Sequence, residues 1–515
     1  MVKSGLIRDR DVKLRCGEVE KAGCGIRERS FSRVSSNATE VACPGAGRKR
    51  LGVEFAAGVA AGVRAATARL RAGGKSSRVV LVLFRVVFRA DSFTDCLITF
   101  PASIGALMNR RSFLAGTAAT LPLQARAMQR AEQPPAPRYT GKPLKITDVQ
   151  AWIVNAGRNY VYVKISTDQG IHGWGEAYSA GPDQATLDTI LDFKSWLVGK
   201  DPRNVEYLWA TMYNFTRFPG GLVVNAAMSG IEHALWDIAG KAAGLPVYML
   251  TGGKCRDKIR CYQAANSPAQ AKALIAKYGY TALKATLPLE STVPQVSGIR
   301  AFGERAAAIR EAIGPNVDLC FDAHGRVWAP YLAYQLAEAL RPVHPLFLEE
   351  AIRPENMDEM AELRRKVQIP IATGEELYTK YQFQQLISAG AADIIQPDIC
   401  LAGGLLEQKK IAAIAESRYV QVAPHNPLGP LATMVNIHFA ASTPNFLVLE
   451  YHPDDTSPRK DLIQGEPVVA KDGYLAIPEK PGWGYEMNEE AFKHMPPKPW
   501  HREFSFDPDG APAFI

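Results

Sequence analysis

The sequence predicts an α/β fold in which a parallel (β/α)-barrel follows a smaller α+β domain. Two patterns support this fold class. Beyond residue 252, short apolar segments recur at intervals of roughly 20 to 40 residues, and a helix-length segment fills most of the gaps between them. Before that point, short runs of alternating apolar and polar residues precede two helical periods. A chain of 515 residues is long enough for two or more such domains, each with its own core.

Residues 1–107 carry no pattern of a folded domain. They are rich in Arg and Gly and have no sustained helical or strand period. Their one apolar patch, at 79–88, is too short to span a bilayer. The sequence therefore predicts that this stretch is disordered or precedes the true start of the protein.

A new pattern begins at Met108. The segment Asn109-Arg110-Arg111-Ser112-Phe113-Leu114 is followed by a run of small and apolar residues and then by Ala125-Arg126-Ala127. This order resembles a twin-arginine export signal with its cleavage site, so residues 108–127 are predicted to direct export to the periplasm. The alternative is that Arg110-Arg111 is a chance basic pair.

The α+β domain is predicted over residues 144–252, after a linker at 128–143 that is rich in Pro and Gln. Alternation of apolar and polar residues predicts a small antiparallel sheet, with strands at 146–154, 160–165 and 171–176. Helical periods follow at 183–198 and 225–243, and Gly244 ends the second helix.

The barrel is predicted over residues 253–461. Its eight strand–helix units have apolar strands that end near Tyr262, Lys284, Asp322, Glu349, Thr373, Pro397, Pro424 and Glu450. The remaining residues, 462–515, are rich in Pro, Gly and aromatic side chains up to about residue 504. We expect this segment to pack back onto the α+β domain.

Composition argues against two classes of partner. The net charge is +8, but much of the basic excess lies before residue 130, so no basic face for a nucleic acid is expected on the folded domains. No predicted segment is long and apolar enough to span a membrane. A small molecule is therefore the expected partner.

Polar residues at the predicted strand ends indicate a single site. In a parallel barrel the carboxyl ends of all the strands meet at one face, so residues far apart in sequence converge there. The residues concerned are Lys284, Asp322 with His324, Glu349 with Glu350, Glu375 with Glu376, Asp398, His425 and Glu450. Acidic side chains on successive strands repel one another unless a cation neutralises them.

Carboxylate oxygens, without Cys or a close pair of His, favour Mg²⁺ as that cation. The expected ligands are Asp322, Glu349 and Glu375. Strand alternation places only one residue of each Glu-Glu doublet inward, and the first of each is taken to share the inward phase of Asp322. The second glutamate of each doublet remains the alternative.

Two histidines could transfer protons at this site. His425 and Asp398 end neighbouring strands, so a hydrogen bond between them would fix the imidazole tautomer and raise its basicity. His324, two residues after Asp322, could protonate a departing hydroxyl. Glu450 could hydrogen-bond an enediolate if it is protonated, or it could be a solvated charge at the rim.

Several segments resemble a known family. They are Phe321-Asp322-Ala323-His324-Gly325-Arg326, Phe347-Leu348-Glu349-Glu350, Ile371-Ala372-Thr373-Gly374-Glu375, Ile395-Gln396-Pro397-Asp398 and Ala423-Pro424-His425-Asn426-Pro427. They are similar to segments in the mandelate racemase branch of the enolase superfamily, and most of all in acid-sugar dehydratases of the galactonate dehydratase type. The resemblance covers about residues 144–504. It includes Gly173-Trp174-Gly175-Glu176 and Ala234-Leu235-Trp236-Asp237-Ile238.

The resemblance implies a barrel of the modified TIM type with an N-terminal capping domain. It implies a Mg²⁺-dependent hydro-lyase that removes the proton alpha to the carboxylate of a galactonate-like sugar acid. Loss of the beta-hydroxyl would then give a 2-keto-3-deoxy acid. A homo-oligomer is also expected.

The resemblance further implies a role for each site residue. Asp322, Glu349 and Glu375 would bind the metal, His425 with Asp398 would be the base, His324 the acid and Glu450 a transition-state stabiliser. Lys284, Asn155 and Arg158 would contact the substrate, with loops 155–159 and 176–181 closing over it. The sequence departs from the family at Ala351, where Pro is usual, and within 287–298, which leaves the stereochemistry of the sugar open.

Two other functions compete with this one. A racemase or epimerase of a 2-hydroxy acid would use the same fold, but Lys284-Ala285-Thr286 lacks the second lysine of the Lys-x-Lys element that such enzymes use. An exported sugar-acid-binding protein without activity would not need the full set of ligands, base and acid. The dehydratase is therefore favoured.

Overall fold

The computed structural model describes residues 143–179, 181–217, 219–286, 295–499 and 509–511, together with five strands between residues 39 and 79. The predicted export signal and all of the predicted linker except Pro143 lie outside the described residues. The chain divides into two compact units, Met1–Arg138 and Tyr139–Ile515.

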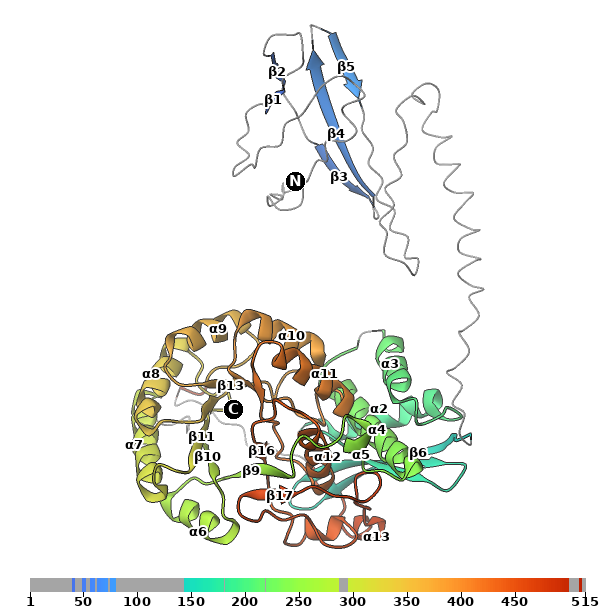
Figure 1. The fold of residues 1–515 in the computed structure, drawn as a ribbon, viewed down its shortest axis with the longest axis vertical. Helices are drawn as coiled ribbons and strands as arrows, with labels where there is room; N and C mark the ends of the chain where they lie inside the picture. Colours follow the sequence, from blue (N-terminus) through green and yellow to red (C-terminus); the bar gives the residue numbers. More distant parts are fainter. Residues whose placement is uncertain are drawn as a thin grey trace. The chain divides into compact units, whose positions relative to one another are not determined.

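The first unit contains two small antiparallel sheets. One pairs β1 (Thr39–Val41) with β2 (Lys49–Leu51). The other joins β3 (Ala56–Ala60), β4 (Val63–Ala72) and β5 (Lys75–Val79), as Figure 1 shows. The sequence predicted no regular structure in residues 1–107, so these strands were not anticipated. That the stretch precedes the true start remains a prediction.

The second unit begins with the capping domain. Its antiparallel sheet consists of β6 (Ile146–Asn155), β7 (Asn159–Thr167) and β8 (His172–Ala177). Three helices follow: α2 (Asp183–Leu197), α3 (Val205–Phe215) and α4 (Leu222–Ala243). The helix α3 was not predicted, and the other elements lie close to their predicted positions.

The crossing of β8 over α4 explains the glycines of the Gly-Trp-Gly-Glu motif. A Cβ at Gly175 would lie 1.8 Å from the carbonyl oxygen of Gly230, and one at Gly173 would lie 2.1 Å from that of Ala234. Any larger residue would therefore force the strand and the helix apart. The motif allows the close approach that also places Glu176, the next residue, against the barrel.

Eight parallel strands form the barrel, in sequence order around its wall. A short helix, α5 (Val247–Leu250), leads into it. The strands are β9 (Lys258–Ala264), β10 (Ala282–Thr286), β11 (Asp318–Asp322), β12 (Phe347–Glu349), β13 (Ile371–Thr373), β14 (Ile394–Ile395), β15 (Gln421–Val422) and β16 (Leu449–Glu450). Hydrogen bonds of Val422 with Asn445 and Leu447 close the wall between β15 and β16.

Helices surround the barrel wall, as Figure 1 shows. They are α6 (Pro268–Tyr278), α7 (Gln295–Ile313), α8 (Pro330–Leu340), α9 (Met357–Lys366), α10 (Thr379–Ala389), α11 (Leu405–Glu416) and α12 (Pro430–Ala441), with the 3-10 turn η3 (Arg341–Val343) after α8. The prediction of eight strand–helix units is wrong for the last one. In the described residues, β16 is followed by the 3-10 turn η4 (Lys460–Leu462), β17 (Tyr474–Ala476) and the four-residue α13 (Glu489–Phe492). Frequent Pro and Gly in this stretch prevent a long helix.

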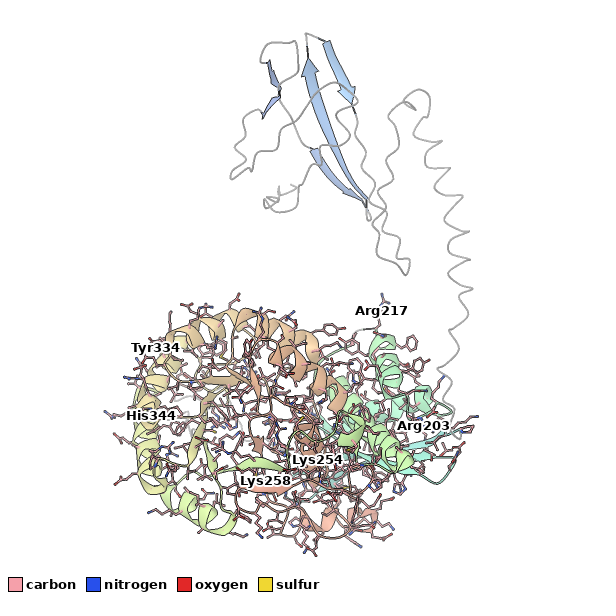
Figure 2. The ribbon with its side chains drawn as sticks, in the orientation of Figure 1. Arg203, Arg217, Lys254, Lys258, Tyr334 and His344 are labelled. Carbon is pink, nitrogen blue, oxygen red and sulfur yellow. The ribbon has the colours of Figure 1, made fainter. Side chains whose placement is uncertain are left out.

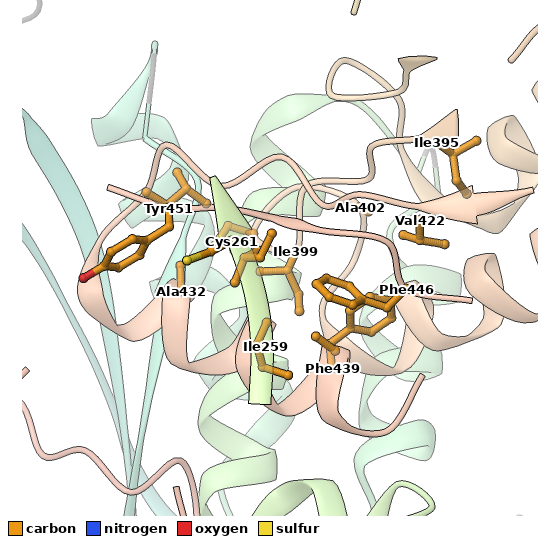
Figure 3. Packing of buried hydrophobic residues seen from close by; sticks show 14 of the residues in the cluster. Ile259, Cys261, Ile395, Ile399, Ala402, Val422, Ala432, Phe439, Phe446 and Tyr451 are labelled. Atoms are coloured by element: carbon orange, nitrogen blue, oxygen red, sulfur yellow. The ribbon is translucent and has the colours of Figure 1, made fainter. Parts of the chain in front are cut away.

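The barrel strands carry apolar residues on both faces, as strands covered by helices do. Their inward side chains form one layer inside the barrel: Tyr262, Ala282, Cys320, Phe347, Ala372, Ile394, Ala423 and Val448. Residues between the inward positions face outward to the helices. Figure 3 shows Ile259 and Cys261 of β9 beside Ala432 and Phe439 of α12.

Residues 474–495 contact both the capping domain and the barrel. The strand β17 pairs antiparallel with β9. Trp483 is buried, its backbone N–H donates to Asp237 (2.9 Å), and its indole Nε1 donates to the carbonyl oxygen of Trp174 (3.1 Å). The ring of Phe492 stacks on that of Tyr162, with centroids 5.3 Å apart. None of the helices in the described part of the chain has the length and apolar content to cross a lipid bilayer.

His438 of α12 is held in its neutral form. Its Nδ1 accepts a hydrogen bond from the Tyr248 N–H (3.1 Å), and its Nε2 donates to the carbonyl oxygen of Trp483 (3.2 Å). Burial lowers its pKa from 6.5 to about 4. The unfolded chain therefore takes up a proton below pH 6.5 that the folded chain does not.

The free energy of unfolding should consequently fall as the pH falls from about 6.5 toward 4, by roughly 1.4 kcal/mol per pH unit from this group. The variant His438→Gln can keep both hydrogen bonds without titrating. We expect its urea-unfolding free energy to depend less on pH in that window than that of the wild type. His344→Gln, at an exposed position, is the control, and equal pH dependence in all three proteins would contradict the prediction.

Candidate active site

The candidate site lies one layer beyond the apolar layer inside the barrel. Because strand side chains alternate, the residue two positions after each inward apolar residue also faces inward. These residues are Ala264, Lys284, Asp322, Glu349, Gly374, Gln396, His425 and Glu450. Most of them are polar and buried, which is where the sequence predicted a convergence of strand ends.

Lys284 lies among three carboxylates. Its Nζ is 3.0 Å from Asp322 Oδ2, 3.2 Å from Glu349 Oε1 and 3.0 Å from Glu450 Oε1. Burial acts to lower the pKa of Lys284, but the carboxylates outweigh it and hold the pKa well above its usual value. Lys284 is therefore a fixed positive charge. It was predicted to bind substrate, and its ammonium group is instead engaged with these side chains.

Glu375 lies at the site, but not for the reason that the sequence predicted. By alternation the inward residue after Ala372 is Gly374, so Glu375 does not share the phase of Asp322 and Glu349. Gly374 has φ of 137°, which breaks the alternation, and a Cβ there would lie 2.8 Å from the Phe383 ring. As a result, Glu375 Oε2 lies 3.7 Å from His425 Nε2.

The second residues of the two doublets differ in environment. Glu376 forms an ion pair with Arg353 (3.3 Å). Glu350 is buried with φ of 41°, and its Oε1 has no hydrogen-bond partner in the described residues. Burial, and then the charge of Glu376, raise the pKa of Glu350 well above its usual value.

His425 and Asp398 form a buried pair. Asp398 Oδ2 lies 2.7 Å from His425 Nδ1, and Asp398 Oδ1 accepts the Cys400 N–H (2.8 Å). Burial opposes protonation of the ring, but the hydrogen bond and charge of Asp398 outweigh it and raise the pKa of His425. A carboxylate can only accept at Nδ1, so this nitrogen carries the proton and Nε2 of the neutral ring carries a lone pair.

His324 contacts the same Asp322 oxygen as the lysine does. Its Nε2 is 3.1 Å from Asp322 Oδ2, and its backbone N–H donates to Asp322 Oδ1 (2.9 Å). That turn holds His324 at φ of 51°. Burial lowers the pKa of the ring, and Asp322 only partly offsets this. A protonated His324 is therefore a stronger acid than an ordinary histidine.

Glu450 is held as a carboxylate. Its Oε2 accepts the Asn426 N–H (2.9 Å), while Oε1 faces Lys284. Burial alone would raise the pKa of Glu450, but Lys284 lowers it well below its usual value. Glu450 is therefore a buried, paired carboxylate and not a solvated charge at the rim, and its role toward an enediolate stays a prediction.

The predicted substrate contacts Asn155 and Arg158 make other interactions. Asn155 donates its side-chain N–H to Asn159 (2.9 Å) across the β6–β7 turn. Arg158 donates to the carbonyl oxygen of Pro427 (3.0 Å) and to that of Ser179. Asn155 therefore stabilises its own hairpin, and Arg158 joins the loop after β8 to the loop that carries His425.

Whether the three predicted ligands suit a metal ion depends on their donor atoms. Glu375 Oε2 is buried without a hydrogen-bond partner in the described residues, Asp322 Oδ2 is buried beside Lys284 and His324, and burial raises the pKa of Glu349 to about 7. Buried carboxylate oxygens are the donors that a hard divalent cation prefers.

The carboxylates do not, however, form a ready ligand set. Among the described residues, no group of three or more His, Cys, Asp or Glu side chains is arranged to hold a metal ion. Lys284 gives the reason, since it attracts Asp322, Glu349 and Glu450 to its own ammonium group. The predicted donors fit the metal by chemistry and burial, while the predicted convergence on one ion is not seen.

A cavity of about 840 Å³ opens beside Glu375. Tyr178 of the capping domain lines it together with Leu222, Arg353, Tyr378 and Gln382. The Tyr178 ring lies 6.4 Å from that of His425 between centroids. Residues 287–294, in the stretch that departs from the family, lie outside the described residues. Neither Tyr334 nor His344, which Figure 2 shows on the outside of the barrel, lines the cavity.

The sequence missed two residues of the site. Tyr178 follows the Gly-Trp-Gly-Glu motif, and only its proximity to His425 reveals it. Gln396 is fully buried, and its side-chain amide acts on Glu349, whose pKa it lowers. Its position two residues before Asp398, in the inward phase, was a signal that could have identified it.

Two domain families match the chain. The mandelate racemase / muconate lactonizing enzyme N-terminal domain matches residues 142–252, and the enolase C-terminal domain-like family matches residues 266–491. The chain belongs to the enolase superfamily. Its sheet-and-helix cap and its parallel barrel are the two domains of that superfamily, whose sites pair a Lys or His base with Mg²⁺.

The relatives of this enolase-superfamily chain include sugar-acid dehydratases. D-galactonate dehydratase from Xanthomonas campestris pv. campestris (strain B100) is 34% identical over 383 residues, which are 72% of this chain and 100% of the relative. D-galactonate dehydratase from Variovorax paradoxus (strain S110) is 35% identical over 386 residues, again 72% and 100%.

Solved structures of the superfamily share the fold. An enolase from Agrobacterium radiobacter, with Na and L-malate bound, is 36% identical with a TM-score of 0.69, covering 72% of this chain and 100% of that one. The 3,6-anhydro-D-galactonate cycloisomerase from Zobellia galactanivorans is 31% identical with a TM-score of 0.63, covering 69% and 100%. Relatives at this distance therefore include more than one reaction.

Proposed function

We propose that the protein is a Mg²⁺-dependent sugar-acid dehydratase that converts a galactonate-like aldonate into a 2-keto-3-deoxy acid. The observation that carries the proposal is the buried His425–Asp398 pair, in which Asp398 binds Nδ1 and Nε2 lies 3.7 Å from Glu375 Oε2. The identity of about 34% to D-galactonate dehydratases over their full length supports the reaction type. Like them, the chain is an enzyme of the hydro-lyase class.

The proton transfers follow from the two histidines. His425 Nε2 accepts the proton from the carbon next to the substrate carboxylate, and Asp398 stabilises the imidazolium that results. His324 gives a proton to the hydroxyl on the neighbouring carbon, which leaves as water as its C–O bond breaks. The enol that remains takes up a proton at carbon to become the keto acid.

The acidic side chains supply the charge balance of the site. Asp322, Glu349 and Glu375 would hold Mg²⁺, which when bound stabilises the negative charge that develops on the substrate carboxylate. Lys284 places a positive charge beside Asp322, Glu349 and Glu450. The burial of these groups excludes water, so each charge acts more strongly than it would in solution.

The racemase alternative lacks a second base. Racemisation needs a proton acceptor on each face of the substrate, and Lys284 is the basic residue on the strand where a second one would lie. Three carboxylates surround its ammonium group and raise its pKa well above the usual value, which disfavours a role as proton acceptor. Thr286, where the missing lysine would be, cannot replace it.

We also propose that residues 108–127 are a twin-arginine signal and that the mature protein acts in the periplasm as a homo-oligomer. The order of basic, apolar and Ala-x-Ala segments supports export. The signal needs an N-terminal position, which is why Met108 is the proposed start. The substrate would then be a sugar acid that reaches the periplasm.

The test is a panel of aldonic and aldaric acids with purified residues 128–515 and Mg²⁺. We expect semicarbazide-reactive 2-keto-3-deoxy acid from a galactonate-like member of the panel, and no product after EDTA treatment until Mg²⁺ is restored. A binding protein would saturate in calorimetry without product, and a racemase would epimerise the substrate without water loss. Either result would overturn the proposal.

A further inference from the structure

The two loops that carry the catalytic pair each lead into a barrel helix. Asp398 lies at the start of the loop that ends where α11 begins, at Leu405. His425 lies at the start of the loop that ends where α12 begins, at Pro430. The positions of these two helix N-termini therefore limit how the imidazole and the carboxylate can meet.

A buried carboxylate of the capping domain binds the N-terminus of α12. Glu176, on β8, accepts the backbone N–H of Gly429 (2.7 Å) and that of Ala432 (2.9 Å). Glu176 has no exposed surface. Gly429 leaves room for it, because a Cβ there would lie 2.6 Å from both carboxylate oxygens.

A second buried carboxylate binds the N-terminus of α11 in the same way. Glu232, on α4, accepts the backbone N–H of Leu405 (2.9 Å) and that of Leu406 (2.9 Å). It too has no exposed surface. A Cβ at Gly404 would lie 2.3 Å from its Oε2, so again a glycine admits the carboxylate.

Other groups of the capping domain bind the same two loops. The carbonyl oxygen of Gly403 accepts the Trp209 indole N–H (2.8 Å), and the Gly403 N–H donates to Ser229 Oγ (3.1 Å). On the other loop, Arg158 donates to the carbonyl oxygen of Pro427 (3.0 Å). The capping domain therefore holds both loops along their length, and the carboxylates bind their far ends.

A neutral Ser, Thr or Asn would cap a helix without the cost of burying a charge. That cost is visible here, because burial raises the pKa of Glu176 to about 7 and that of Glu232 to about 8 against the lowering effect of the backbone hydrogen bonds. In return, a carboxylate at a helix N-terminus binds more strongly and through two N–H groups at once.

We propose that Glu176 and Glu232 are positioning residues that set the geometry of the His425–Asp398 pair from the capping domain. The inference rests on the proposed function for its kinetic consequences. Its structural part does not depend on the substrate. It states that the two carboxylates maintain the hydrogen bond between His425 and Asp398 in the resting protein.

The test compares Glu176→Gln and Glu232→Gln with the wild type. An amide keeps the size of the side chain but presents an NH₂ group to one of the two backbone N–H donors. We expect kcat to fall by about 10- to 100-fold with KM changed by less than about threefold, because small misplacements of reacting groups cost rates of this order. The low-field proton resonance of the His425–Asp398 hydrogen bond, assigned by its loss in His425→Asn, should weaken or disappear.

Asp237→Asn is the matched control. Asp237 is also a fully buried carboxylate of the capping domain, and it accepts the backbone N–H of Trp174 (3.0 Å) and of Trp483 (2.9 Å). Neither Trp174 nor Trp483 belongs to the two catalytic loops, 398–404 and 425–429. We expect Asp237→Asn, like the two glutamine variants, to lose thermal stability. Unlike them, it should keep kcat and the low-field resonance.

Several outcomes separate the possibilities. If both glutamine variants keep kcat and the resonance, or if Asp237→Asn loses them equally, the positioning role is overturned. If Glu176→Gln does not fold, Gly429→Ala displaces the same carboxylate at a backbone with φ of −80°, where alanine is not strained, and should give the same kinetic and spectral changes. If the wild type converts no sugar acid, the proposed function fails while the resonance still tests the positioning role.

Discussion

Replacing His425 with asparagine is expected to lower both water loss and exchange of the substrate alpha proton by about 10⁴-fold, the upper end of what a positioned base contributes. Asp398 binds Nδ1 of His425, so Nε2 is the ring nitrogen that is left to accept the alpha proton. Asparagine is close in size and can still donate to Asp398, so the loop should keep its shape. The measurement is loss of the alpha-proton signal in D₂O, followed by NMR, together with product detection.

The matched control is His344→Asn, the same change at an exposed position outside the barrel. His344 has φ of 49°, a backbone conformation that asparagine tolerates well. We expect this variant to exchange the proton and release water at wild-type rates. Turnover by the His425 variant at the wild-type rate would show that another group is the base.

Strand alternation predicted part of the site because it is a local property. Asp322 and Glu349 end apolar strands in the inward phase, and the structure brings both within 3.2 Å of Lys284. The same rule also predicted that Glu375 faces the site, but Glu375 does not share the inward phase on which that prediction was based. Its orientation depends on the positive φ of Gly374, which the alternation of a regular strand does not include.

Contacts between distant segments could not be predicted from sequence. Glu176 was noted only as part of a motif, and its hydrogen bond to Gly429 spans 253 residues. The state of Glu450 depends on Lys284, which comes from the strand on the other side of β9. In both cases a charge was visible in the sequence, but the partner that determines its role was not.

His324→Asn is expected to separate the two proton transfers. If His324 only protonates the departing hydroxyl, its loss should reduce water loss by about 10³-fold while His425 still exchanges the alpha proton at a rate close to that of the wild type. The ring is suited to this step because burial lowers its pKa, which makes the protonated form a strong acid, while Asp322 at 3.1 Å favours that form. Asparagine keeps the backbone N–H that donates to Asp322 and tolerates φ of 51°, so Asp322, a proposed metal ligand, should stay in place. Normal dehydration would rule out His324 as the acid, and loss of exchange along with dehydration would mean that the substitution disturbs Asp322 rather than a proton transfer.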